Sequence, residues 1–233
     1  LWCDPMHDFG FYQYDPADLK FQEKQTEIKL NPEGAQIGIP IRVLGNDAGE
    51  KLSILSGIMA RIDRAAPHYG LRKYNDHNTF YYQAASMTSG GSSGSPVINN
   101  EGHAVALNAG GSKKAASSFF LPLDRPARAL HLLQNGEKIP RGTIQTIFTY
   151  ETYDEIKRLG LNPTTEELVR KKNPNGIGML TVNKAIKKGP GAEFFCPGDI
   201  IVRVNSELVL NFIELEEIFD NSVGKSIGVE IDR

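Results

Sequence analysis

The feature that most constrains this chain is the run Gly-Ser-Ser-Gly-Ser-Pro at residues 91–96, which is followed at once by the apolar pair Val97-Ile98. A serine with glycine two residues before it and one after it can occupy a tight, exposed turn whose backbone approaches a bound molecule closely. Such a turn aims the backbone N–H groups of Gly91 and Ser93 at one point, as the stabilisation of an oxyanion requires. We therefore interpret Ser93 as a nucleophile.

The alternative for this run is a flexible Gly/Ser linker, which is the usual meaning of such composition. The flanking residues argue against a linker. An aromatic strand is predicted upstream at residues 80–83, and a turn at 99–102 followed by an apolar strand at 104–107 is predicted downstream. Since a linker is not normally framed so closely by strands, the pattern favours the nucleophile.

The first half of the chain reads as a series of short strands that are separated by turns. The predicted strands cover residues 39–44, 51–58, 80–83, 96–98, 104–107 and 119–123. A helix over 125–135 follows them. Several strands at this turn-punctuated spacing favour a mainly β fold that closes into a barrel.

The chain is long enough for two small domains, since it has 233 residues, of which 40% are hydrophobic and 23% charged. The polar segment at 134–140 predicts the end of a helix and a linker. We therefore expect a first domain over residues 1–135 and a second over 141–233.

A candidate partner for the serine lies near the start of the chain. The segment Asp-Pro-Met-His-Asp-Phe-Gly-Phe at residues 4–11 places Asp8 at the mouth of an apolar strand. Taken alone, Asp8 is most simply an ordinary carboxylate at the start of a strand. The segment nevertheless resembles the one that holds the triad aspartate in trypsin-like serine proteases, and residues 91–96 resemble their Gly-Asn-Ser-Gly-Gly-Pro motif. The resemblance implies the second barrel of a trypsin-like fold, with Asp8 and Ser93 as catalytic residues.

The histidine base of such a triad is not evident in the sequence. In this family the histidine precedes the aspartate by a few tens of residues, and His7 adjoins Asp8, so that on a strand the two side chains would point to opposite faces. The remaining histidines, which do not match the motif position either, are His68, His77, His103 and His131. We expect the base to lie before residue 1, which would make the chain a fragment; a pseudoenzyme without this histidine is the alternative.

The resemblance also implies a specificity pocket, which loops at residues 84–90 and 107–110 would border. Met87 stands six residues before the serine, where trypsin-like enzymes place the residue that selects charge, and we expect Asn108 and Ala109 to line the same pocket. Because no carboxylate stands at residue 87, we expect small or medium apolar side chains to be preferred over Arg or Lys.

The second half of the chain resembles a PDZ domain of the HtrA type, which has an α/β fold. Its motifs are a strand at 178–182, a Pro-Gly-Asp-Ile turn at 197–200 and a helix that Asn211 caps, with Glu214 at the capping-box position. The loop that binds the C-terminal carboxylate of a peptide is implied at Gly142, Thr143, Ile144, Gln145 and Thr146. Gln145 stands where glycine is usual, and we expect the last strand of the domain to be truncated at residue 233.

Together these motifs resemble an HtrA/DegP-type serine protease, and in detail the fungal nuclear Nma-type subgroup, in which two HtrA units are repeated and which is linked to apoptosis and lipid homeostasis. The resemblance implies proteolysis of unfolded or peptide substrates, binding of protein C-termini, a possible homo-oligomer and a nuclear location. A pseudoprotease that binds peptides and a PDZ scaffold remain as alternatives.

Composition and charge exclude several other classes of function. The formal net charge of −2 gives no general attraction to nucleic acid, and no apolar run reaches the length of a membrane span. The two cysteines, Cys3 and Cys196, have neither the spacing of a metal site nor a disulfide framework. We therefore expect no cofactor and no metal.

Overall fold

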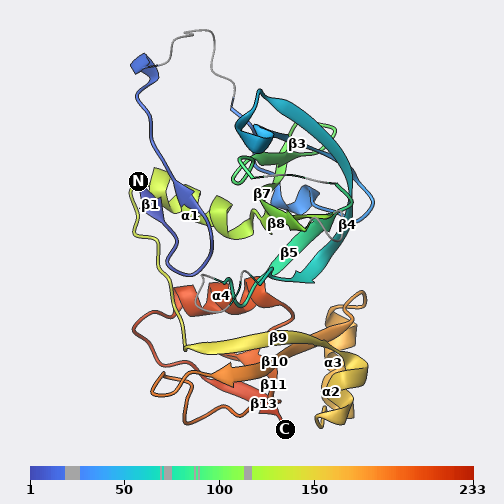
Figure 1. The fold of residues 1–233 in the computed structure, drawn as a ribbon. Helices are drawn as coiled ribbons and strands as arrows, with labels where there is room; N and C mark the ends of the chain where they lie inside the picture. The colour runs from blue at the N-terminus through green and yellow to red at the C-terminus, as the bar shows by residue number, and fades with distance from the viewer. Residues whose placement is uncertain (19–26, 69, 71–74, 87, 89, 113–116) are drawn as a thin grey trace. The chain divides into compact units, whose positions relative to one another are not determined.

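The computed structural model describes residues 1–18, 27–68, 70, 75–86, 88, 90–112 and 117–233, with the side chain of residue 112 left out. The chain forms two compact units, Leu1–Lys138 and Ile139–Arg233. Figure 1 labels most of their helices and strands, and each unit is described by itself below.

Six antiparallel strands of the first unit form a closed barrel in the order β3-β4-β5-β8-β7-β6 (Figure 1). The strands are β3 (Pro40–Gly45), β4 (Ser53–Ala65), β5 (Phe80–Ala84), β6 (Pro96–Ile98), β7 (Ala104–Ser112) and β8 (Ser117–Pro122). The barrel that the strand pattern predicts is therefore present. β4 extends well beyond the predicted 51–58, and irregular register after Met59 and Arg61 lets such a long strand bend around the barrel.

The barrel core follows from the alternation of side chains along each strand. In β3, Ile41 and Val43 are each 1% exposed, whereas Arg42 between them is exposed. Their side chains meet Val97 of β6 and Phe120 of β8, both fully buried. A shift of one residue in the strand pairing would turn these apolar side chains outward, so their burial fixes the register of the strands. The same register fixes where residues 91–95, which connect β5 to β6, are placed.

Two further elements of the first unit flank the barrel strands in the sequence. A short hairpin, β1 (Trp2–Cys3) and β2 (Gly10–Phe11), contains Asp8 in its connection. The predicted helix is α1 (Asp124–Gln134), which ends at Asn135. Single 3₁₀ turns lie at Pro16–Asp18, Pro32–Gly34 and Asp47–Gly49.

The second unit is a five-stranded antiparallel sheet with three helices (Figure 1). Its elements are β9 (Thr146–Thr152), α2 (Tyr153–Arg158), α3 (Pro163–Lys172), β10 (Gly178–Ala185), β11 (Ile200–Val204), β12 (Glu207–Leu208), α4 (Phe212–Asn221) and β13 (Val229–Asp232). The predicted strand at 178–182 is part of β10, and β11 follows the Pro-Gly-Asp-Ile turn. The sequence reading did not anticipate α2 and α3, although Asn162 before Pro163 is a recognisable helix start, and its side chain caps the Thr164 N–H.

Helix α4 begins where the sequence predicts. The Asn211 side chain accepts hydrogen bonds from the backbone N–H groups of Ile213 and Glu214, which satisfies two donors that have no partner inside the helix. The capping box is modified, because the Glu214 carboxylate accepts from the N–H of Leu210 at 2.7 Å rather than from that of Asn211. The helix is thus fixed at its start by two side chains.

Candidate active site

The predicted nucleophile lies in a tight turn between β5 and β6, here named the serine turn (residues 91–95). Gly91 (φ +106°) and Gly94 (φ +81°) both adopt backbone conformations that favour glycine. The Ser95 N–H donates to the Ser92 carbonyl at 3.1 Å and closes the turn. Ser93 is exposed, and its hydroxyl makes no hydrogen bond with the described residues, so it is free to meet a substrate.

The peptide group between Gly90 and Gly91 is held from one side only. The Gly90 carbonyl accepts a hydrogen bond from the Ala48 N–H at 2.7 Å. Because the C=O and N–H of a trans peptide point in opposite directions, the Gly91 N–H points away from Ala48. It donates to no acceptor within the described part of the chain. This is the arrangement that an oxyanion donor needs.

The peptide group between Ser92 and Ser93 is held in the same way. The Ser92 carbonyl accepts from Asn108 Nδ2 at 2.8 Å, in addition to the Ser95 N–H. The Ser93 N–H on the other side of this peptide has no acceptor among the residues that the structure describes. The carbonyls of Gly90 and Ser92 are therefore held by hydrogen bonds, while the N–H groups of the same two peptides, those of Gly91 and Ser93, remain available to a substrate.

Ser92 has a role that the sequence reading missed. Its side chain is fully buried, and its Oγ donates to Oδ1 of Asp47 at 2.6 Å. Asp47 lies in the connection between β3 and β4, 45 residues earlier in the chain. The second carboxylate oxygen of Asp47 lies 3.5 Å from the hydroxyl of Ser53. Two neighbouring serines thus face opposite environments, since Ser92 is buried against a carboxylate while Ser93 is exposed.

The backbone of the β3–β4 turn (residues 46–50) lies directly against the serine turn. A Cβ atom at Gly91 would approach the carbonyl oxygen of Asn46 to 2.6 Å and the nitrogen of Gly49 to 3.0 Å. A Cβ at Gly45, the last residue of β3, would lie 2.7 Å from Ser92 Oγ. Glycine is therefore needed at both positions for the two turns to make contact.

The predicted specificity pocket is described only in part. Met87 lies outside the described residues. Asn108 is 2% exposed, and besides its bond to Ser92 its Oδ1 accepts from the Thr88 hydroxyl at 3.2 Å. Ala109 is partly buried next to it in β7. The contacts of Asn108 make it a support of the serine turn, and the pocket role of these residues stays a prediction.

Asp8 lies in the β1–β2 hairpin, where its carboxylate is exposed and its backbone N–H lies 3.5 Å from Oδ2 of Asp76. The side chain of Asp76 also accepts a short hydrogen bond from the buried hydroxyl of Tyr81. On the other side, the Asp4 carboxylate accepts from the N–H of His7 at 2.7 Å. These bonds fix the backbone around Asp8, and no hydrogen bond joins Asp8 to Ser93 among the described residues.

No histidine of the described chain is hydrogen bonded to Ser93. His7 is 1% exposed, and its Nε2 lies 2.9 Å from the backbone carbonyl of His77, so its imidazole joins the hairpin to the segment before β5. His103 pairs with Glu101 at 3.1 Å, and His131 lies on α1. The structure thus brings together the serine turn and its supports without a base.

The predicted carboxylate loop of the second unit is anchored to helix α4. The Gly142 N–H donates to Oδ1 of Asp220 at 2.9 Å, and Arg141 Nη1 lies 2.6 Å from Oδ2 of the same carboxylate. Gln145 has φ +53°, and its N–H donates to the Thr143 hydroxyl at 3.0 Å. A non-glycine residue therefore occupies a left-handed position at the point where glycine is usual in the family that the sequence resembles.

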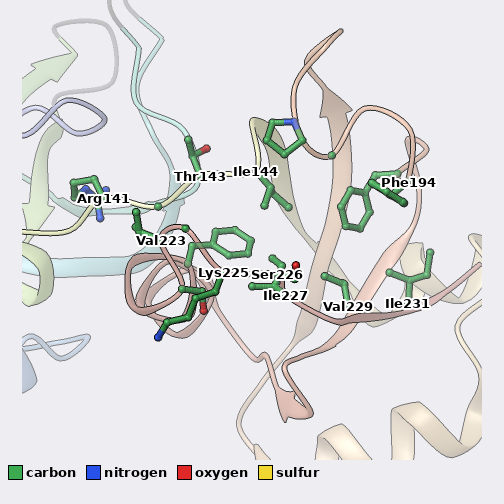
Figure 2. Close-up of a pocket in the computed structure, with 17 residues that line it drawn as sticks. Arg141, Thr143, Ile144, Phe194, Val223, Lys225, Ser226, Ile227, Val229 and Ile231 are labelled. Carbon is green, nitrogen blue, oxygen red and sulfur yellow. The ribbon is translucent and has the colours of Figure 1, made fainter.

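The anchored loop borders an apolar groove of about 880 Å³ (Figure 2). Ile144 lines it together with Phe194, Val229 and Ile231, and Lys225 is among its polar lining residues. Of the five predicted loop residues, Gly142, Thr143 and Ile144 line this groove, whereas Gln145 and Thr146 do not; Thr146 begins β9.

A closed six-stranded barrel with an exposed serine in a glycine-containing turn is the arrangement expected of a trypsin-like peptidase domain. Comparison with protein families agrees, since residues 1–107 match the trypsin-like peptidase domain. The chain also shares the fold of a solved HtrA-type protease, AlgW with a tripeptide, with a TM-score of 0.57 and 19% identity over 88% of this chain and 64% of that one.

Two curated relatives match the whole chain. A pro-apoptotic serine protease NMA111 of Ajellomyces capsulatus is 51% identical over 234 residues, and Protease Do-like 7 of Arabidopsis thaliana is 52% identical over 244 residues. The chain spans 23% of the length of the first and 22% of the second. The chain is therefore similar in sequence, over its whole length, to proteins that are named as proteases.

The comparisons confirm the family resemblance that the motifs at residues 4–11 and 91–96 carry. Within the described ranges, no helix is long and apolar enough to cross a membrane. No group of three or more His, Cys, Asp or Glu side chains in those ranges could hold a metal ion.

Proposed function

We propose that this chain is the serine-bearing part of a serine endopeptidase that hydrolyses peptide bonds by acyl transfer. Ser93 Oγ attacks the carbonyl carbon of the peptide, and a histidine of the longer protein takes its proton. Asp8 orients that histidine and stabilises its charged form. The carbonyl oxygen, which becomes negatively charged, accepts hydrogen bonds from the N–H groups of Gly91 and Ser93. The amine leaves with the proton, and water then releases the acyl group from Ser93.

The observation that carries this proposal is the serine turn itself. Ser93 is exposed, and the N–H groups on either side of Ser92 are both left without acceptors in the described chain because neighbouring residues hold the carbonyls of their peptide groups. A flexible linker would not have its carbonyls fixed in this way. Loss of one such donor typically lowers kcat by about 10²- to 10³-fold.

The test is a pair of serine substitutions in the full-length protein, assayed on an unfolded casein-like substrate. Ser93→Ala is expected to abolish cleavage, because Ser93 carries the exposed hydroxyl beside the two donors, whereas the Ser92 hydroxyl is buried against Asp47. Ser95→Ala is expected to retain much of the activity, since the Ser95 contact that closes the turn uses the backbone. Full activity in Ser93→Ala would refute the proposed nucleophile, whereas absence of cleavage by the parent protein would favour a pseudoprotease.

We further propose that the second unit is a PDZ-type domain that binds the C-termini of peptides or proteins. The apolar groove beside Ile144 supports this role, because it can take an apolar last side chain next to backbone N–H groups of the loop. Two of the loop donors are already used, since the Gly142 N–H is bound to Asp220 and the Gln145 N–H to Thr143. We therefore expect weak binding, in the micromolar range.

Titration of the full-length protein with an apolar peptide and with its C-terminally amidated twin tests the carboxylate role. The free acid is expected to bind more tightly than the amide. Equal binding of both peptides would exclude carboxylate recognition by residues 142–146 and would leave this unit as a scaffold.

The cellular setting is proposed from the relatives. NMA111 proteins are named pro-apoptotic serine proteases. We propose a similar role for the longer protein, with a nuclear location, a link to lipid homeostasis, repeated HtrA units and possible homo-oligomers, and with unfolded proteins or peptides as substrates.

A further inference from the structure

The contact between the β3–β4 turn and the serine turn contains a charged group that the proposed mechanism does not use. The carboxylate of Asp47 accepts the Ser92 hydroxyl at 2.6 Å, and Ser92 is fully buried. A hydrogen bond to a carboxylate is shorter and stronger than one between neutral groups, and more so where water is excluded. This bond therefore ties the two turns together through their side chains.

A second bond joins the same two turns through the backbone. The Ala48 N–H, which follows Asp47 directly, donates to the Gly90 carbonyl at 2.7 Å. That bond sets the plane of the peptide between residues 90 and 91, and so the direction of the Gly91 N–H. Ala48 has φ +57°, a left-handed conformation that a non-glycine residue adopts only when its surroundings hold it there. Asp47, through its bond to Ser92, is one of the groups that hold it, beside the Asn46 side chain, whose Nδ2 donates to the Glu50 carbonyl at 2.9 Å.

We propose that Asp47 is a positioning residue of the active site. By accepting the hydrogen bond of Ser92, its carboxylate holds the β3–β4 turn in the conformation in which Ala48 fixes the Gly90–Gly91 peptide. The Gly91 N–H then points toward the developing oxyanion before substrate binds. This inference rests on the proposed function, because it gives Asp47 a part in the same reaction.

The test compares Asp47→Ala, Asp47→Asn and the parent, all as full-length proteins. Asp47→Ala is expected to lower kcat about 10- to 100-fold while KM changes less than about twofold, because the donor is misaligned but the substrate site remains. Asp47→Asn is expected to stay within about fivefold of the parent, since its amide oxygen can still accept from Ser92. Asp63→Ala is the matched control, because the Asp63 carboxylate pairs with Arg61 on the barrel surface at 3.0 Å.

Amide hydrogen exchange of the segment that contains the serine turn gives a readout that does not need activity. Exchange of this segment is expected to be faster in Asp47→Ala than in the parent, Asp47→Asn or Asp63→Ala. Unchanged exchange together with unchanged kcat in Asp47→Ala would overturn the proposal. Equal losses in Asp47→Ala and Asp47→Asn would also overturn it. If the Ser93→Ala protein still cleaves substrate, the proposed function fails, and hydrogen exchange alone then decides whether Asp47 holds the turn.

Discussion

Replacement of Gly91 by alanine is expected to inactivate the serine turn without unfolding the barrel. The new Cβ would lie 2.6 Å from the Asn46 carbonyl oxygen, whereas ordinary contact begins at about 3.4 Å, so the backbones must separate by about 0.8 Å. Misplacement by about 1 Å can cost about 10²-fold in rate. In addition, a non-glycine residue in a sparsely populated backbone region costs on the order of 1–3 kcal/mol.

Two other glycines separate the effect of the backbone angle from that of the close contact. Gly94 has φ +81° and lies in the same turn, but a Cβ there would meet nothing within 4 Å. Gly102 has φ +79°, is equally open, and lies in the turn between β6 and β7. Gly94→Ala and Gly102→Ala therefore carry the backbone cost of about 1–2 kcal/mol without the collision.

The assay is kcat/KM on an unfolded protein substrate, with the thermal midpoint measured on the same samples. We expect Gly91→Ala to lose at least about 100-fold in kcat/KM, Gly94→Ala to lose about 10-fold or less, and Gly102→Ala to keep the parental value. All three variants are expected to have lower midpoints. If Gly91→Ala keeps nearly parental kcat/KM, the Gly91 N–H is not an oxyanion donor, and the argument from the contact with Asn46 is wrong.

Two predictions concern the dependence of stability on pH. The hydrogen-bonded Arg233 guanidinium holds the pKa of Asp199 below its usual value of about 3.9, so the stabilisation is present above that pH and is lost as pH falls through the lowered pKa. Urea unfolding should show Arg233→Ala less stable than the parent at pH 6, and the difference should shrink as the pH is lowered through the pKa of Asp199 in the folded state. Burial raises the pKa of Asp124 at the start of α1, so the folded state holds its proton more tightly and stability falls as pH rises from about 4 through the raised value. Asp124→Asn should therefore raise the thermal midpoint at pH 7 and leave it unchanged at pH 3, and a lower midpoint at pH 7 would contradict this.

Much of the fold could be predicted because its signals are local. The alternation of Ile41 and Val43 with polar neighbours marks β3, and Asn211 marks the start of α4. The helices at 153–158 and 163–172 were missed, since they are short and their buried residues, Tyr153 and Ile156 in the first and Val169 in the second, find their apolar partners only in a tertiary cluster that includes Met179 of β10.

The sequence by itself determined the serine turn, because the need for glycine at residues 91 and 94 is a property of the local backbone. Only the tertiary structure decided what holds that turn. Asp47 reaches Ser92 across 45 residues, and Asn108 reaches the Ser92 carbonyl from β7, because β3 and β7 both pair with β6 as the barrel closes. Pairing between strands depends on which apolar faces are buried together. Neither a carboxylate in a turn nor an amide in a strand carries a local sign of the partner that this burial brings to it.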